Sequence, residues 1–135
     1  MSIEIDEIIL EIAEEQETLD YVKELLQMAL FEQGVEGKEY ADSTIKVKKR
    51  KGQPTNRVTL KDSGDFYDSW VVSANNNGFV FTSDPTKGDY SLFDDYDENL
   101  VFKTMDEETL DKLYDHFTLR IINKLNQKLY DTLGL

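Results

Sequence analysis

The chain has 135 residues, enough for one domain with its own core and too few for two domains of ordinary size. Apolar residues make up 39% and aromatic residues 11%, which excludes a disordered tail, although 28 acidic against 15 basic residues give a net charge of -13. There is no cysteine, so disulfides and thiolate chemistry are excluded. With no long apolar run and no basic-apolar leader, we expect no membrane partner and synthesis in the cytoplasm.

The first predicted element is a long amphipathic helix over about residues 5–33. Its apolar residues recur at helical spacing while acids fill the other face, and Gly34 and Gly37 provide a stop signal. The apolar positions are Ile5, Ile8, Ile9, Ile12, Leu19, Val22, Leu26 and Ala29.

The middle of the chain, about residues 43–83, is predicted to be β-rich. Residues 43–50 alternate polar and apolar, and 57–61 resume a short β-type run, so the two could form a hairpin with a basic tip. Asp62 or Ser63 can cap a short helical turn after it. Residues 70–75 and 78–83 form the clearest hairpin, because the intervening asparagines and Gly78 tolerate positive φ.

A second long helix is predicted over about residues 105–132. Thr104 and Glu107 have the spacing of a capping box, and apolar residues follow at three- and four-residue steps: Leu110, Leu113, Tyr114, Phe117, Ile121, Leu125 and Leu129. The predicted fold is therefore a single α+β domain, 1–135, with long N- and C-terminal helices packed on a small antiparallel sheet.

The sequence contains no phosphate-binding loop, no zinc-binding helix and no Cys–His pair, so we predict no enzyme activity and no cofactor. His116, the only histidine, is assigned a structural role, with a Ser–His site as the alternative. Two acidic groups, Asp62 with Asp65 and Asp68, and Asp94, Asp95, Asp97 with Glu98, are interpreted as solvated or interface surface. A cation site is the alternative for both groups.

Charge is distributed unevenly along the chain. Residues 1–33 carry ten acids and one base, and residues 62–135 carry fifteen acids and six bases. Residues 38–61 between them carry eight bases and two acids. Opposed charge of this kind can steer association with copies of the same chain or with another charged surface.

The basic run is predicted to meet acidic surface on a neighbouring subunit or to protect a strand edge, in preference to binding nucleic acid. Trp70, beside Phe66 and Tyr67, is interpreted mainly as core, although the hairpin around Trp70 and Phe79 is also a candidate source of interface affinity. The candidate interface residues are Lys46, Lys48, Lys49, Arg50, Lys51, Trp70 and Phe79.

Residues 58–84 resemble the signature of bacteriophage virion-morphogenesis proteins of the neck and tail-completion type. The pattern is Leu-x-Asp-Ser/Thr-Gly-x-Phe/Leu-x-x-Ser followed by two short strands, and it is matched by Leu60, Asp62, Ser63, Gly64, Phe66 and Ser69. The form of the motif is most similar to versions from phages of gut Bacteroidetes. The resemblance covers about a fifth of the chain closely.

The resemblance implies a structural head-tail connector subunit, located in the virion and forming a homo-oligomeric ring with other neck or tail proteins. Non-specific contact with DNA in a channel is a further option for the basic segment. The alternative function is a small acidic phage-encoded inhibitor that mimics nucleic acid, suggested by the charge of -13. The basic segment distinguishes the two, because a polyanion mimic does not need it.

Overall fold

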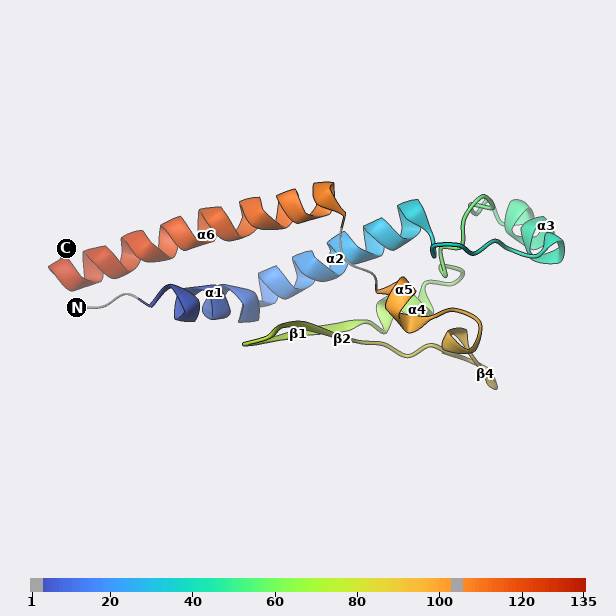
Figure 1. The fold of residues 1–135 in the computed structure, drawn as a ribbon, viewed down its shortest axis with the longest axis horizontal. Helices are drawn as coiled ribbons and strands as arrows, with labels where there is room; N and C mark the ends of the chain where they lie inside the picture. Colours follow the sequence, from blue (N-terminus) through green and yellow to red (C-terminus); the bar gives the residue numbers. More distant parts are fainter. Residues whose placement is uncertain (1–3, 103–105) are drawn as a thin grey trace.

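The computed structural model describes residues 4–102 and 106–135 of an elongated α+β molecule. Two helices in line form the middle layer, α1 (Ile5–Glu14) and α2 (Gln16–Gln33). The long helix α6 (Glu107–Leu133) lies along one side of this layer and runs antiparallel to it, while a β-hairpin lies on the other side (Figure 1). The predicted fold class, long terminal helices with a small antiparallel sheet, is confirmed.

The predicted N-terminal helix is interrupted at Glu15, which has the extended conformation φ -63°, ψ 135°. Ile12 and Thr18, on either side of the break, are both fully buried. In an uninterrupted helix these two positions would lie roughly 120° apart around the axis, at about 100° per residue. The break therefore turns α2 so that its buried side chains face the same core as those of α1.

Gly34 ends α2, as predicted, with φ 74°. Its N–H donates to the Leu30 carbonyl at 2.8 Å, and the next amide, Val35 N–H, donates to the Val58 carbonyl at 2.8 Å. A Cβ at position 34 would lie 2.8 Å from Arg57 Cβ and 3.0 Å from Val58 N. Only glycine fits this crossing of two backbone segments.

The strand predicted over 43–50 is wrong, because these residues form the helix α3 (Asp42–Arg50). The alternation suggested that Val47 is inward and Lys48 outward, whereas Val47 is 45% exposed and Lys48 only 7%. The least exposed residues of the segment are Thr44, Ile45 and Lys48, and positions separated by three and four residues lie on the same face of a helix. Asp42 at the start and the bases at the end also complement the helix dipole.

The strand predicted over 57–61 is also wrong, and no basic hairpin spans 46–57. Consecutive residues Val58 and Thr59 are both fully buried, which a half-exposed strand does not allow. Thr59 N–H donates to the Tyr40 hydroxyl at 3.0 Å, and its carbonyl accepts from the Tyr67 hydroxyl at 2.5 Å. Leu60 then adopts φ 58°. Tyrosine side chains thus satisfy backbone groups that a strand would place in a ladder.

The hairpin predicted over 70–83 is confirmed as β1 (Val71–Asn75) and β2 (Gly78–Thr82), paired antiparallel from Val71–Thr82 to Asn75–Gly78. A second small sheet, β3 (Thr86–Lys87) with β4 (Tyr90–Ser91), was not predicted. The remaining short elements are α4 (Asp65–Asp68), the 3-10 turn η1 (Leu92–Asp94) and α5 (Glu98–Val101).

The helix predicted near the C-terminus is confirmed as α6, and its N-cap is Asp106, whose carboxylate accepts from Thr109 N–H at 2.8 Å. Thr104, the predicted capping residue, lies outside the described residues. An aromatic cluster of the core packs near the C-terminal half of α2, where Trp70 contacts Phe66, Tyr67 and Phe102. Trp70 is 2% exposed, so the interpretation as core is correct and its side chain is not available to a partner.

Candidate interaction site: the basic helix and the Asp62 network

The exposed part of the basic segment is one face of α3, which lies at the end of the molecule remote from the two chain ends (Figure 1). Lys46, Lys49 and Arg50 are exposed there. None of the three forms an ion pair with any residue in 4–102 or 106–135. We call these three residues the α3 basic patch, and it can accept an acidic partner without breaking any described contact.

Lys48 and Lys51, predicted with that patch, have structural contacts instead. Lys48 is buried, with Nζ 4.7 Å from the centre of the Tyr40 ring and 3.3 Å from Gln53 Oε1. Lys51 pairs with Asp62 at 2.8 Å. Lys48, predicted as an interface residue, is therefore part of the packed structure, where its aliphatic stem is buried and its ammonium group lies over the Tyr40 ring.

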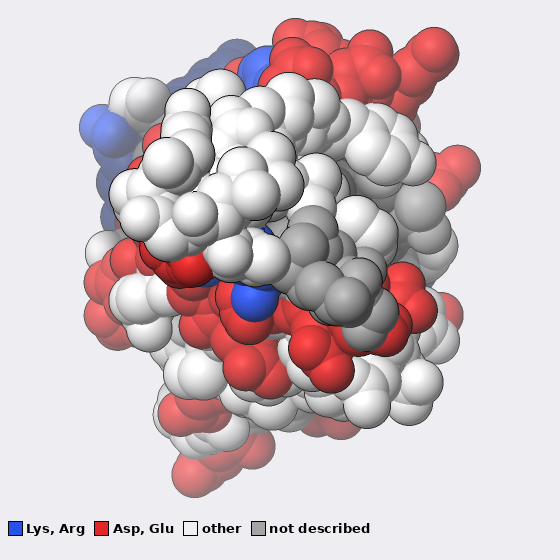
Figure 2. Space-filling view, turned by 90° about the vertical axis from the view of Figure 1, so that its left-hand side faces the viewer, with Lys and Arg blue, Asp and Glu red and all other residues white. Residues whose placement is uncertain are grey.

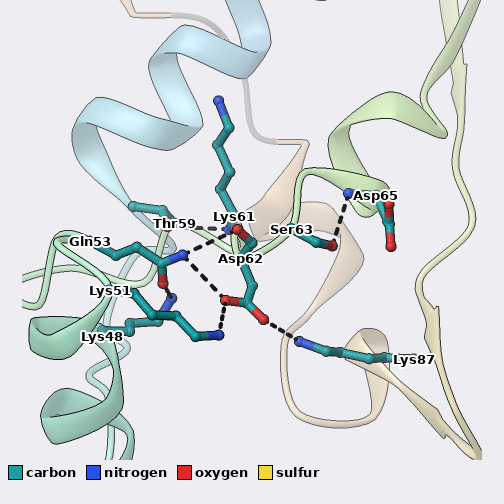
Figure 3. A network of polar contacts seen from close by, with 9 residues as sticks. All are labelled: Lys48, Lys51, Gln53, Thr59, Lys61, Asp62, Ser63, Asp65 and Lys87. Atoms are coloured by element: carbon teal, nitrogen blue, oxygen red, sulfur yellow. Dashed lines mark hydrogen bonds and ion pairs between the residues drawn. The ribbon is translucent and has the colours of Figure 1, made fainter.

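Asp62 joins three segments through its carboxylate (Figure 3). Oδ1 accepts from Lys51 of the segment after α3 at 2.8 Å and from Gln53 at 3.2 Å, and Oδ2 accepts from Lys87 of β3 at 3.1 Å. The bond from Lys51, followed by that from Lys87, holds the pKa of Asp62 well below its ordinary value of 3.8. Asp62 is thus a clamp between α3 and the β3–β4 sheet.

The other residues of the phage-like motif also have structural tasks. Ser63 Oγ accepts from Asp65 N–H at 3.4 Å, and Gly64, with φ 94°, precedes α4. Phe66 is buried in the aromatic core. Ser69 Oγ donates to the Phe66 carbonyl at 2.6 Å and accepts from Asp84 N–H at 2.9 Å. With Leu60, which packs against the same core, the motif specifies a folded turn.

An open groove of about 950 Å³ lies between α3, the 62–66 turn and the β3–β4 sheet. Four bases line it, Lys38, Lys48, Lys51 and Lys87, and so do four acids, Glu39, Asp62, Asp65 and Asp95. Tyr90 closes one side by donating to Asp95 at 2.6 Å, a bond that raises the pKa of Tyr90 to about 12. The balanced charge does not favour a polyanion in this groove.

His116 has the structural role predicted for it. Its Nε2 lies 2.8 Å from the Thr18 hydroxyl, and its ring centre lies 4.9 Å from that of Tyr21. Partial burial, followed by the charge of Arg120, lowers the pKa of His116 below its ordinary value of 6.5. The histidine therefore joins α6 to α2 in its neutral form.

Basic residues of α6 face acids of the N-terminal helices in a ladder that the sequence analysis missed. Lys124 Nζ lies 3.4 Å from Glu15 and 3.7 Å from Glu11, and Lys128 reaches Glu11 at 3.9 Å. Arg120 pairs with Glu17 at 2.5 Å. A signal was present, because the bases at 120, 124 and 128 and the acids at 11 and 15 both repeat every four residues.

At the end of the molecule where both chain ends lie, acidic side chains outnumber basic ones (Figure 2). Uncharged surface forms a broad patch in the upper part of this view. Exposed acids at the start of α1 include Asp6 and Glu7. The α3 basic patch lies at the opposite end of the long axis (Figure 1). The opposed charge expected from the sequence is thus separated along the length of the molecule.

Comparisons with family models, with curated proteins and with solved structures find no match. Across the described residues, no helix has both the length and the apolar character needed to cross a membrane. Within the same ranges, no group of three or more potential ligands is arranged to hold a metal ion.

Proposed function

We propose that the chain is a structural assembly protein that binds further copies of itself. The observation that carries this proposal is the apolar surface of α6. Only Thr109 of its 27 residues is buried, and six large apolar or aromatic side chains are exposed: Tyr114, Leu119, Ile122, Leu129, Tyr130 and Leu133. Exposed apolar surface of this extent, bordered by charged residues, is typical of protein interfaces.

We further propose that the assembly is the neck or tail-completion region of a tailed-phage virion, with no enzymatic role. The motif at residues 60–69 supports this assignment through its resemblance to the neck and tail-completion signature. Its residues form the folded turn and the short helix α4 that precede the β1–β2 hairpin. The α3 basic patch supplies a second contact, to acidic surface on a neighbouring subunit or to DNA. Those free bases also disfavour the inhibitor alternative, since a nucleic-acid mimic gains nothing from them.

Oligomeric state tests the self-association. The unchanged chain should sediment as an oligomer, and the variant with both Ile122→Glu and Leu129→Glu should have a lower mass, because carboxylates would then occupy the apolar surface of α6. The matched control carries Asn123→Glu and Asn126→Glu, which add the same charge at exposed polar positions of α6. An unchanged mass for the Ile122 and Leu129 variant would contradict the proposed surface.

Mass spectrometry of purified phage particles tests the virion assignment. The chain should be present in intact particles at a fixed ratio to the other neck proteins. Particles that lack it, together with tight binding of the chain to a host nuclease, would replace this proposal with the inhibitor alternative.

A further inference from the structure

The β1–β2 hairpin is notable for its lack of charge. Residues 69–83 contain no Asp, Glu, Lys or Arg, in a chain of which 32% is charged. The two strands pair one to one from Val71–Thr82 to Asn75–Gly78, without a bulge. Proteins commonly protect free strand edges with charges, prolines or bulges, and this hairpin has none of these. Its free edge is therefore suited to pairing with another strand.

Both edges of the hairpin lack a partner strand among the described residues, and the edge of β2 is the one farther from the backbones of α1 and α2. β1 is the strand that lies against these helices. A two-residue turn is closed by a hydrogen-bonded pair, here Asn75–Gly78, and such pairs alternate along the ladder. Phe79 and Phe81 therefore direct their backbone N–H and C=O groups away from β1.

We propose that β2 of a second copy pairs antiparallel with this edge, with Val80 opposite Val80 of the second copy. The inference rests on the proposed assembly role and names one of its contacts. In this register Phe79 lies opposite Phe81 of the second copy, and each such pair exchanges both backbone hydrogen bonds. The two hairpins then form one continuous sheet. Phe79, a predicted interface residue, contributes its backbone, because its ring packs on Phe117 at 6.5 Å.

The absence of charge at this edge favours a second copy as the partner. Because the chain has a net charge of -13, most of its surfaces would bring acidic residues together if two copies met through the same surface. The edge of β2 carries no acidic residue. The antiparallel register also places Asp84, which follows β2, beside the neutral Asn76 of the second copy. A parallel arrangement would instead set Asp84 beside Asp84, which is unfavourable.

The hairpin touches α6 where Phe79 packs on Phe117, whereas the exposed apolar residues of α6 from Leu119 to Leu133 follow that contact toward the C-terminal end of the helix. The strand contact joins two copies in a self-complementary pair, and the apolar surface of α6 remains available to extend the assembly.

A pair of variants at Val80 tests the register. Val80 is 43% exposed on the outer face of the sheet, so Val80→Lys and Val80→Glu should each fold. Each variant alone places like charges side by side, and its β2-mediated pairs should be lost in sedimentation. An equimolar mixture of the two should recover the pairs, because lysine then faces glutamate. Met28→Lys and Met28→Glu, at a helix position that is 45% exposed, are the matched controls and should leave the mass unchanged.

Amide hydrogen exchange of the unchanged chain provides an independent measurement. The Phe79 and Phe81 amides should exchange more slowly as protein concentration rises, whereas the amide of Glu36, an exposed residue outside the hairpin, should not change. Variants that keep the unchanged mass, a mixture that fails to recover the pairs, or fast exchange at every concentration would overturn the proposed strand pairing. Oligomers that persist through α6 while Phe79 and Phe81 exchange fast would overturn the strand pairing alone. Absence of the chain from virions would overturn the virion role alone.

Discussion

Arg120 of α6 forms an ion pair with Glu17 of α2, with Nη2 2.5 Å from Oε1, although 103 positions separate the two residues. The neighbouring contacts of Lys124 and Lys128 continue this ladder toward α1. These ion pairs border half-buried apolar residues of α6, among them Leu113, Phe117, Ile121 and Leu125, so charge and apolar packing both hold the helix in place. The docking of α6 should therefore be sensitive to salt and to charge reversal.

Lys124→Glu should lower the free energy of unfolding by on the order of 1 kcal/mol, because the new carboxylate faces Glu11 and Glu15. Urea unfolding at low salt measures the change. Lys112→Glu is the control, since Lys112 pairs only with Glu108 of its own helix. Equal losses in the free energy of unfolding for the two variants would contradict a stabilising role of the ion-pair ladder. So would a difference between the two losses that high salt leaves unchanged.

Gly34→Ala should lower the free energy of unfolding by roughly 2–4 kcal/mol, the sum of a left-handed backbone penalty and a steric clash. The clash arises because the new Cβ would approach Arg57 and Val58. Gly37→Ala separates the two causes, since Gly37 has φ 73° but no atom within 4 Å of the added Cβ. Thermal or urea unfolding should therefore rank Gly37→Ala as the milder change, and equal losses would refute the clash.

His116 should make the fold less stable in mild acid. Its pKa in the folded chain lies below the ordinary value of 6.5, so the unfolded chain binds the proton first. The contribution of His116 is fully present above pH 6.5 and is lost as the pH falls from 6.5 to the lowered pKa. His116→Gln should flatten this part of the stability profile, measured by urea unfolding at a series of pH values. An identical profile for the variant would contradict the prediction.

Replacing the α3 basic patch, with Lys46, Lys49 and Arg50 all changed to Ser, should leave the fold intact and slow assembly. Exposed charges contribute more to encounter rate and orientation than to affinity, so the difference should shrink at high salt. Light scattering during assembly measures the rate, and circular dichroism checks the fold. If the triple variant assembles at the normal rate at low salt, the patch is only solvated surface.

Lys48→Ser should behave differently from the triple variant, because Lys48 is buried. We expect a loss of about 1–2 kcal/mol in the free energy of unfolding, from the missing stem packing and the missing contact with the Tyr40 ring. Lys48→Met is the matched variant, because it keeps the packing of the stem and removes only the cation, so its loss should be smaller than that of Lys48→Ser. Full stability of Lys48→Ser would show that the burial of Lys48 is energetically neutral.

The long helices and the 70–83 hairpin could be predicted because their signals are local. α6 shows a repeat of apolar residues from Leu110 to Leu129, more than about five turns, and the asparagines before Gly78 favour a tight turn whatever surrounds them. The break at Glu15 had no such signal, since neither glycine nor proline is present there. It follows from the need to bury Ile12 and Thr18 in one core, which is a tertiary requirement.

The segment 43–50 was ambiguous for a physical reason. In so short a segment, Ile45 and Val47 fit an alternating pattern as well as a helix, and only the residues packed against it decide which side chains are buried. That partner is Tyr40 with Gln53, which together accommodate Lys48. For the candidate site, the motif predicted a turn at 62–64, but the role of Asp62 depends on Lys87, which lies 25 residues further along the chain.

In the unfolded chain, the uncharged run 69–83 is the segment most prone to aggregate, because its β-branched and aromatic residues carry no repelling charge. Asp65 and Asp68 precede it and Asp84 follows it, in the positions of gatekeeper residues. Synthesis offers a second protection. α1 and α2 precede the hairpin, so part of the surface that covers its inner face is already translated when residues 69–83 emerge, whereas Phe102 and Phe117, which pack on Phe81 and Phe79, follow later.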